Sequence, residues 1–217
     1  MEKPKYKDAD ILLETPYVNV YDLQYEDGTH YYDASRRKKE ALFASKEHPG
    51  MPDAVSGFVI LKFPDRPRLL MFQEYRYPTG QYVLSIPSGL IDQKDMKTDQ
   101  PLIHALEREL REETGIIIRD KDVMKVIQPL VFCSPGFTDE STALIAVVVN
   151  LQDDHELNQN GAEGTERFDG FILADMEETK KILANGCDEH GVPYPLVTWA
   201  AMMYFVSRQW EVLGKGE

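Results

Sequence analysis

Short apolar stretches, in places alternating with polar residues, recur along most of this chain and predict β-strands. Near the N-terminus, two such stretches at residues 18–23 and 29–32 flank the turn signal Glu26-Asp27-Gly28 and predict a hairpin. Farther along, six stretches are typical of strands: residues 55–63, 68–75, 82–86, 123–132, 142–151 and 168–173. The pattern therefore predicts a small β unit over residues 1–50 and a larger domain over residues 51–217.

Helical spacing replaces this alternation in three other stretches. Leu102, Leu106 and Leu110 recur every fourth residue and predict an amphipathic helix. Two more helices are predicted over residues 175–184 and 194–213, and Gly186 follows the first of them. Strands interleaved with helices predict an α/β fold in which a mixed sheet lies between helical layers.

The ends of the leucine-rich helix carry recognisable signals. Asp99 is the candidate N-cap, and Pro101 suits the first turn, where its missing N–H does no harm. Gly115 is predicted to adopt the left-handed conformation just past the helix end.

An acidic stripe lies beside the leucines on this helix. Glu109 and Glu113 are four residues apart and Glu112 is adjacent, so the three carboxylates project from neighbouring positions. Such carboxylates repel one another unless a cation lies between them, and Mg²⁺ prefers oxygen ligands. The alternative is a solvated acidic face that Arg–Glu pairs stabilise.

Residues 85–95, Ser-Ile-Pro-Ser-Gly-Leu-Ile-Asp-Gln-Lys-Asp, predict a strand end followed by a Pro/Gly loop and an acidic turn. Together with residues 108–116, Arg-Glu-Leu-Arg-Glu-Glu-Thr-Gly-Ile, they resemble the Nudix box, the loop–helix–loop motif of the Nudix hydrolases. Gly89 opens the box, and its closing half matches at every fixed position. The chain departs from the pattern in three ways: Asp95 replaces a glutamate, residues 96–100 lengthen the spacer, and Ser85 stands where many relatives have a glutamate.

This resemblance implies the Nudix α/β/α sandwich with a mixed sheet, plus a small N-terminal β unit. It also implies Mg²⁺ as the cofactor, with Mn²⁺ as the alternative. Glu109, Glu112 and Glu113, with the backbone carbonyl of Ser88, would bind the metal. Arg108, one helical turn before Glu112, would orient that carboxylate.

Residues 73–78 resemble the Gln-x-Tyr-Arg pattern of the ADP-ribose pyrophosphatases, in which the arginine contacts a substrate phosphate. Arg76 suits this role because a guanidinium binds phosphate oxygens in pairs. The alternative is that Arg76 pairs with Glu74 or another acid.

Residues 134–140 resemble the Ser-Pro-Gly-x-x-x-Glu loop of the same subfamily, which lines the substrate pocket. The alternative is an ordinary turn between two strands. The resemblance implies substrate contacts from Ser134, Pro135, Gly136, Phe137 and Glu140.

Residues 161–168 correspond to a mobile acidic loop that supplies a general base in these enzymes. Glu163 and Glu166 are both candidates, and Glu166 is favoured. The glycines that flank them suit a loop that closes over a substrate. The alternative is a solvated acidic loop.

Composition narrows the class of protein. A net charge of −13 excludes a general nucleic-acid-binding surface but allows a phosphate-bearing ligand, because metal ions can supply positive charge locally. The two cysteines predict reduced thiols rather than a disulfide. No apolar run typical of a signal peptide follows the N-terminus, and residues 196–206 are too few to span a bilayer. We therefore expect a cytoplasmic protein that binds neither nucleic acid nor membrane.

The resemblance implies Mg²⁺-dependent hydrolysis of a small nucleoside diphosphate derivative, first of all ADP-ribose, to AMP and ribose 5-phosphate. One alternative is hydrolysis of another nucleotide-sugar or of a dinucleotide. A further alternative is a Nudix domain that only binds ADP-ribose. We also expect a homodimer in which the N-terminal β unit takes part.

Overall fold

The computed structural model describes residues 3–46, 50–161 and 164–213. The chain forms two compact units, of which the first consists of residues 1–53 and 130–142. The second consists of residues 54–129 and 143–217. The main boundary thus lies near residue 53. Residues 130–142, which the sequence pattern places in the larger domain, belong to the first unit.

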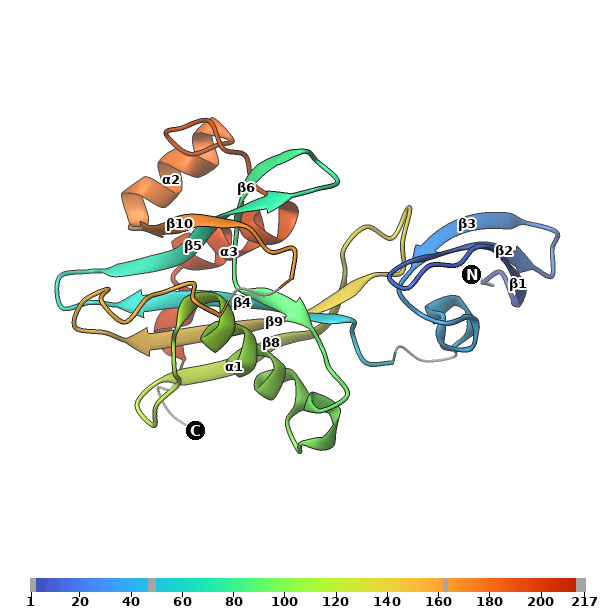
Figure 1. Cartoon of the computed structure of the whole chain (residues 1–217), viewed down its shortest axis with the longest axis horizontal. Coiled ribbons are helices and arrows are strands. Elements are labelled where there is room, and N and C mark those ends of the chain that lie inside the picture. The colour runs from blue at the N-terminus through green and yellow to red at the C-terminus, as the bar shows by residue number, and fades with distance from the viewer. Residues whose placement is uncertain (1–2, 47–49, 162–163, 214–217) are drawn as a thin grey trace. The chain divides into compact units, whose positions relative to one another are not determined.

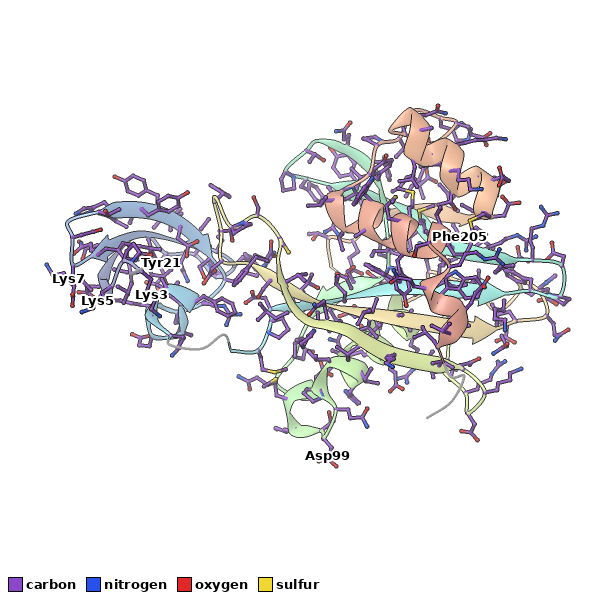
Figure 2. The ribbon with its side chains drawn as sticks, turned by 180° about the vertical axis from the view of Figure 1, so that it is seen from behind. Lys3, Lys5, Lys7, Tyr21, Asp99 and Phe205 are labelled. Carbon is purple, nitrogen blue, oxygen red and sulfur yellow. The ribbon has the colours of Figure 1, made fainter. Side chains whose placement is uncertain are left out.

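The first unit contains a three-stranded antiparallel sheet, in the order β1-β2-β3 (Figure 1). Its strands are β1 (Tyr6–Leu13), β2 (Asn19–Tyr25) and β3 (His30–Ser35). β2 and β3 form the expected hairpin, whereas β1 was not predicted because seven of its eight residues are at least partly exposed and show no alternation. Two short 3₁₀ helices follow, η1 (Lys39–Ala41) and η2 (Phe43–Ser45). A small core of Ala9, Tyr21 (labelled in Figure 2), Leu23 and Leu42 holds the unit together.

The second unit is built on a seven-stranded sheet among the described residues, in the order β10-β5-β4-β9-β8, with β6 paired to β5 and β7 to β4. Six of these strands lie within two residues of their predicted bounds. The seventh, β7, falls in the Pro/Gly loop and was not predicted, because three residues are too few to show a pattern. The strands are β4 (Ala54–Lys62), β5 (Pro67–Arg76), β6 (Gln81–Ser85), β7 (Ser88–Leu90), β8 (Val123–Phe132), β9 (Ser141–Asn150) and β10 (Phe168–Ala174).

Helices cover both faces of this sheet, with α1 (Pro101–Thr114) on one face and α2 (Met176–Asn185) and α3 (Leu196–Val206) on the other (Figure 1). Successive residues of β4 alternate between the two cores. Val59 packs with Leu106 of α1, whereas Ile60 packs with Phe205 of α3, which Figure 2 labels. The chain therefore has the α/β/α sandwich that its resemblance implied.

Helix ends agree with the sequence signals in most places. α1 begins after Gln100, which makes no side-chain cap, so the predicted N-cap at Asp99 is wrong; Asp99 is exposed before the helix (Figure 2). α2 begins with a capping box formed by Asp175 and Glu178.

The last helix is shorter than predicted. It ends at Val206, because Arg208 takes a left-handed backbone (φ 60°) and a 3₁₀ helix, η4 (Gln209–Val212), follows. The Trp210 indole then donates a hydrogen bond to the Phe205 carbonyl at 3.1 Å, which satisfies a group at the helix end. Within the described part of the chain, no helix is both long and apolar enough to cross a membrane.

Gly115 ends α1 in the predicted left-handed conformation (φ 73°), and Gly186 ends α2 in the same way (φ 76°). A Cβ at Gly115 would overlap the side chain of Asn158, while a Cβ at Gly186 would meet nothing within 4 Å. We expect Gly186→Ala to lower the free energy of unfolding by ~1–2 kcal/mol, the cost of a left-handed alanine. Gly115→Ala should cost more, as urea denaturation of both variants would measure. Equal losses of unfolding free energy in the two variants would show that the Asn158 side chain moves aside without cost.

Candidate active site

The acidic stripe of α1 faces the loop that leads out of β6. Glu109 and Glu113 are buried, with 7% and 5% of their surface exposed, whereas Glu112 is half-buried. The backbone N–H of Ser88 donates a hydrogen bond to Oε2 of Glu113 at 3.1 Å. A Cβ at Gly89 would overlap the Glu109 carboxylate, so any larger residue would have to displace that side chain. The box glycine and the box carboxylates are therefore packed directly against each other.

Arg108 connects most of the acidic groups. Its Nη1 donates to Glu109 Oε1 at 2.7 Å and to Glu112 Oε2 at 3.1 Å. Its Nη2 donates to the Leu90 carbonyl at 2.9 Å and to Asp95 Oδ2 at 3.1 Å. The structure thus places Arg108 against Glu112, as expected, and also ties it to the loop before the helix.

Asp95 has a structural role that the sequence left open. Its side chain is fully buried, and it accepts hydrogen bonds from the Asp92 N–H at 2.9 Å and from Arg108. The His104 side chain is exposed, and its Nδ1 lies 2.8 Å from Asp95 Oδ1. Burial opposes ionisation of Asp95, yet these three hydrogen bonds outweigh it and hold its pKa below the usual value. Asp95 therefore anchors the inserted loop to α1 as an anion.

Two box carboxylates, Glu109 and Glu113, resist ionisation. Burial raises the pKa of Glu113 well above its usual value, and the charge of Glu109 raises it further. Burial also raises the pKa of Glu109, although Arg108 opposes this. A cation bound beside these buried carboxylates would stabilise their ionised form.

An oxygen-only donor set suits Mg²⁺ or Mn²⁺ rather than a thiolate-binding metal. Among the histidine, cysteine, aspartate and glutamate side chains that the structure describes, no three converge on one point. Arg108 pairs with Glu109 and Glu112, so both would turn from its guanidinium to share a cation. The residues present fit a hard divalent ion after this side-chain rearrangement.

Arg76 pairs with Glu74, the alternative that the sequence left open. Nη2 of Arg76 lies 2.9 Å from Oε2 of Glu74, and the Arg76 side chain is 49% exposed. Burial raises the pKa of Glu74, which is 8% exposed, while Arg76 lowers it. Glu74 was not predicted to be a site residue. Its position two residues before Arg76 on the same strand was the available signal, since such residues share a face.

Of the two candidate general bases, the structure describes only Glu166. Glu166 is exposed. Its charge raises the pKa of Glu74, Glu109 and Glu113, so Glu166 lies near all three. Glu163 lies outside the described residues. Glu166 therefore lies within electrostatic reach of the box carboxylates, and its role as the general base stays a prediction.

The loop of residues 134–140 belongs to the first unit, whereas the box carboxylates belong to the second. It connects β8 to β9 and is bound to β3: the Ala34 N–H donates to the Phe137 carbonyl at 3.1 Å, and the Tyr31 hydroxyl donates to the Gly136 carbonyl at 2.9 Å. Glu140 accepts from Arg36 Nε at 2.9 Å. Phe137 is 68% exposed. Substrate contacts from Ser134, Pro135 and the rest of this loop stay a prediction.

Comparison with known proteins adds the family. The model of the NUDIX domain matches residues 52–188. A Caenorhabditis elegans protein named as a nudix hydrolase is 35% identical over 127 residues, which cover 58% of this chain and 52% of that protein. The ADP-ribose pyrophosphatase of Saccharomyces cerevisiae is 32% identical over 126 residues, covering 56% of this chain and 50% of that protein. The ADP-sugar pyrophosphatase of Mus musculus is 28% identical over 123 residues, covering 56% and 52%.

The chain therefore spans about half the length of the curated relatives it matches. Among solved structures, the crystal structure of an ADP compounds hydrolase matches with a TM-score of 0.59 and 18% identity, covering 100% of this chain and 97% of that one. This likeness shows the fold.

Proposed function

The chain belongs to the Nudix family, and on that premise we propose that it hydrolyses a nucleoside diphosphate linked to a second group, with ADP-ribose as the first candidate substrate. The observation that carries the proposal is the packing of Glu109 and Glu113 against Gly89 and Ser88, with Arg108 between Glu109 and Glu112. The ADP-ribose and ADP-sugar pyrophosphatases among the relatives support ADP-linked substrates.

In this proposal Glu109, Glu112 and Glu113, with the backbone of Ser88, would hold Mg²⁺ or Mn²⁺. Such an ion, when bound, offsets the charge of the diphosphate and lowers the pKa of a water ligand.

The other side chains act on the substrate and the proton. Arg76 would exchange its contact with Glu74 for the diphosphate, where its fork binds two oxygens. Glu166 or Glu163 would accept the proton of the attacking water, whose oxygen forms the new bond to phosphorus as the bridging P–O bond breaks. For ADP-ribose the products are AMP and ribose 5-phosphate.

Turnover against a panel tests this function. ADP-ribose, ADP-glucose, GDP-mannose, NADH, diadenosine polyphosphates and deoxynucleoside triphosphates would each be incubated with Mg²⁺, and phosphate released by a coupled phosphatase would be measured. We expect preference for ADP-ribose, loss of turnover with EDTA, and recovery with excess Mg²⁺. If only a different diphosphate is hydrolysed, that compound replaces ADP-ribose as the assigned substrate. Binding of ADP-ribose without turnover of any substrate would indicate a sensor.

We also propose that the chain forms a homodimer through its first unit. Apolar side chains are exposed along β1 and the following loop, including Ile11 at 50%, Leu12 at 57% and Tyr17 at 81%. β1 is an edge strand of the small sheet, and an apolar edge is a surface that pairs with another chain.

Light scattering at micromolar concentration should give about twice the 24.9 kDa mass of one chain. Leu12→Asp should shift the dimer toward monomer, and Lys7→Asp, on the same strand, serves as the control for added charge. A monomeric unaltered protein would contradict the proposal.

A further inference from the structure

We infer that Glu74 is a further carboxylate ligand of the metal site, in addition to the three glutamates of α1. This inference rests on the proposed function and deepens it. Glu74 lies on β5, outside the box sequence, so nothing in the box pattern indicates the role.

The strand direction places Glu74 on the face of the sheet that α1 covers. Leu70, four residues earlier on β5, packs in the core cluster that contains Leu106 and Leu110 of α1. Side chains two or four residues apart on a strand share a face. Glu74 is 8% exposed, so its carboxylate lies inside this layer rather than at the surface.

Arg76 is the cation that pairs with this carboxylate. Nη2 of Arg76 contacts Oε2 of Glu74. Arg76 is half exposed and Glu74 is buried, so the arginine binds the carboxylate from the solvent side. A buried carboxylate with a single exposed cation is not fully neutralised, because much of that ion pair is screened by water.

A buried hydroxyl beside Glu74 indicates that a polar ligand belongs here. Ser85 pairs with Phe72 across β5 and β6, and Glu74 pairs with Val83, so Ser85 and Glu74 are diagonal neighbours on one face. Ser85 is 3% exposed, and its hydroxyl is close enough to lower the pKa of Glu74, yet its Oγ makes no well-formed hydrogen bond. Buried polar atoms nearly always have a hydrogen-bond partner in the protein, in water or in a bound ion. The Ser85 hydroxyl therefore indicates that a cation, or a water bound to it, occupies this position.

The chain connects this position to the box. β6 ends at Ser85, and three residues later the Ser88 N–H donates a hydrogen bond to Glu113 Oε2 at 3.1 Å. The strand pair that carries Glu74 therefore leads directly into the loop that contacts the box carboxylates.

Titration of the full chain with Mn²⁺, followed by electron paramagnetic resonance of the free ion, tests this inference without a substrate. We expect Glu74→Gln to weaken Mn²⁺ binding about 10–100-fold, as loss of groups around a metal does. Glu177→Gln, which removes one exposed charge on α2, should leave the affinity unchanged. Circular dichroism would check that both variants fold.

Two more variants separate a metal ligand from a mere partner of Arg76. The double variant Glu74→Ser/Ser85→Glu moves the carboxylate to the adjacent strand and should recover most of the Mn²⁺ affinity. This double variant also tests the metal ligand if Glu74→Gln does not fold. Arg76→Ala should leave Mn²⁺ binding intact. Unchanged affinity in Glu74→Gln, or no binding by a folded double variant, would overturn the inference.

The outcome is distinguishable from failure of the proposed function. If Glu74→Gln loses Mn²⁺ affinity and the unaltered protein hydrolyses no diphosphate, Glu74 is a metal ligand but the proposed function is wrong. If the unaltered protein hydrolyses ADP-ribose and Glu74→Gln keeps its full Mn²⁺ affinity, the proposed function stands but Glu74 is not a metal ligand.

Discussion

Glu113→Gln is expected to lower kcat by about 10²–10³-fold or more, the range observed when one preorganised charge-stabilising group is removed from an active site. The amide keeps the shape of the side chain and its contact with the Ser88 N–H, but it cannot supply a negative oxygen to a metal. Steady-state turnover of the best substrate, at saturating Mg²⁺, measures the effect.

The same variant should be at least as stable as the unaltered protein at neutral pH. Burial raises the folded-state pKa of Glu113 above its unfolded value, so the folded state binds the proton more tightly. Stability therefore falls as pH rises from the unfolded pKa toward the folded one, and ionised Glu113 is a destabilising group above that window. The uncharged amide of the variant removes this penalty, so thermal unfolding without added metal should show no loss.

Glu107→Gln on the same helix is the matched control, because Glu107 belongs to none of the contacts described for the site. It should keep both turnover and stability. Full turnover in Glu113→Gln would show that this carboxylate is not catalytic. If the unaltered protein only binds ADP-ribose, Glu113→Gln should retain that binding, which would favour the sensor.

Arg108→Ala should lower the free energy of unfolding by about 3–5 kcal/mol, the cost of breaking a buried ion pair from one side. The substitution leaves Asp95, which is fully buried, without its cation, and it also frees the Leu90 carbonyl. Glu109 would lose its contact at 2.7 Å as well. Urea denaturation at neutral pH measures the loss.

The pH dependence of this loss follows from Asp95. Its folded-state pKa is depressed, so its contribution to stability is present above the unfolded pKa and disappears as pH falls through the folded one. The difference between Arg108→Ala and the unaltered protein should therefore shrink in acid. Arg111→Ala, an exposed arginine on the same helix, should cost little at any pH. Similar losses in both variants would contradict a buried role for Arg108.

Features with a short-range physical cause could be predicted from the residues alone. The stripe of Glu109, Glu112 and Glu113 follows from the helical repeat, and the left-handed ends at Gly115 and Gly186 follow from the absence of a Cβ. Six of the seven strands described in the second unit could likewise be predicted from their short apolar stretches, whereas β7 was missed. One local signal misled: Asp99 is a good cap by type, but the helix begins one residue later because Pro101 occupies its first position.

Features that depend on the path of the chain could not be predicted. The pairing of Glu74 with Arg76, the anchoring of Asp95 by Arg108 and His104, and the membership of residues 134–140 in the first unit all depend on segments that fold against one another. No periodicity records which strand lies beside which, because register is set by core packing across the whole sheet. The residues thus specified the chemistry carried by one helix, and the folded sheet specified which other acids and cations share its surroundings.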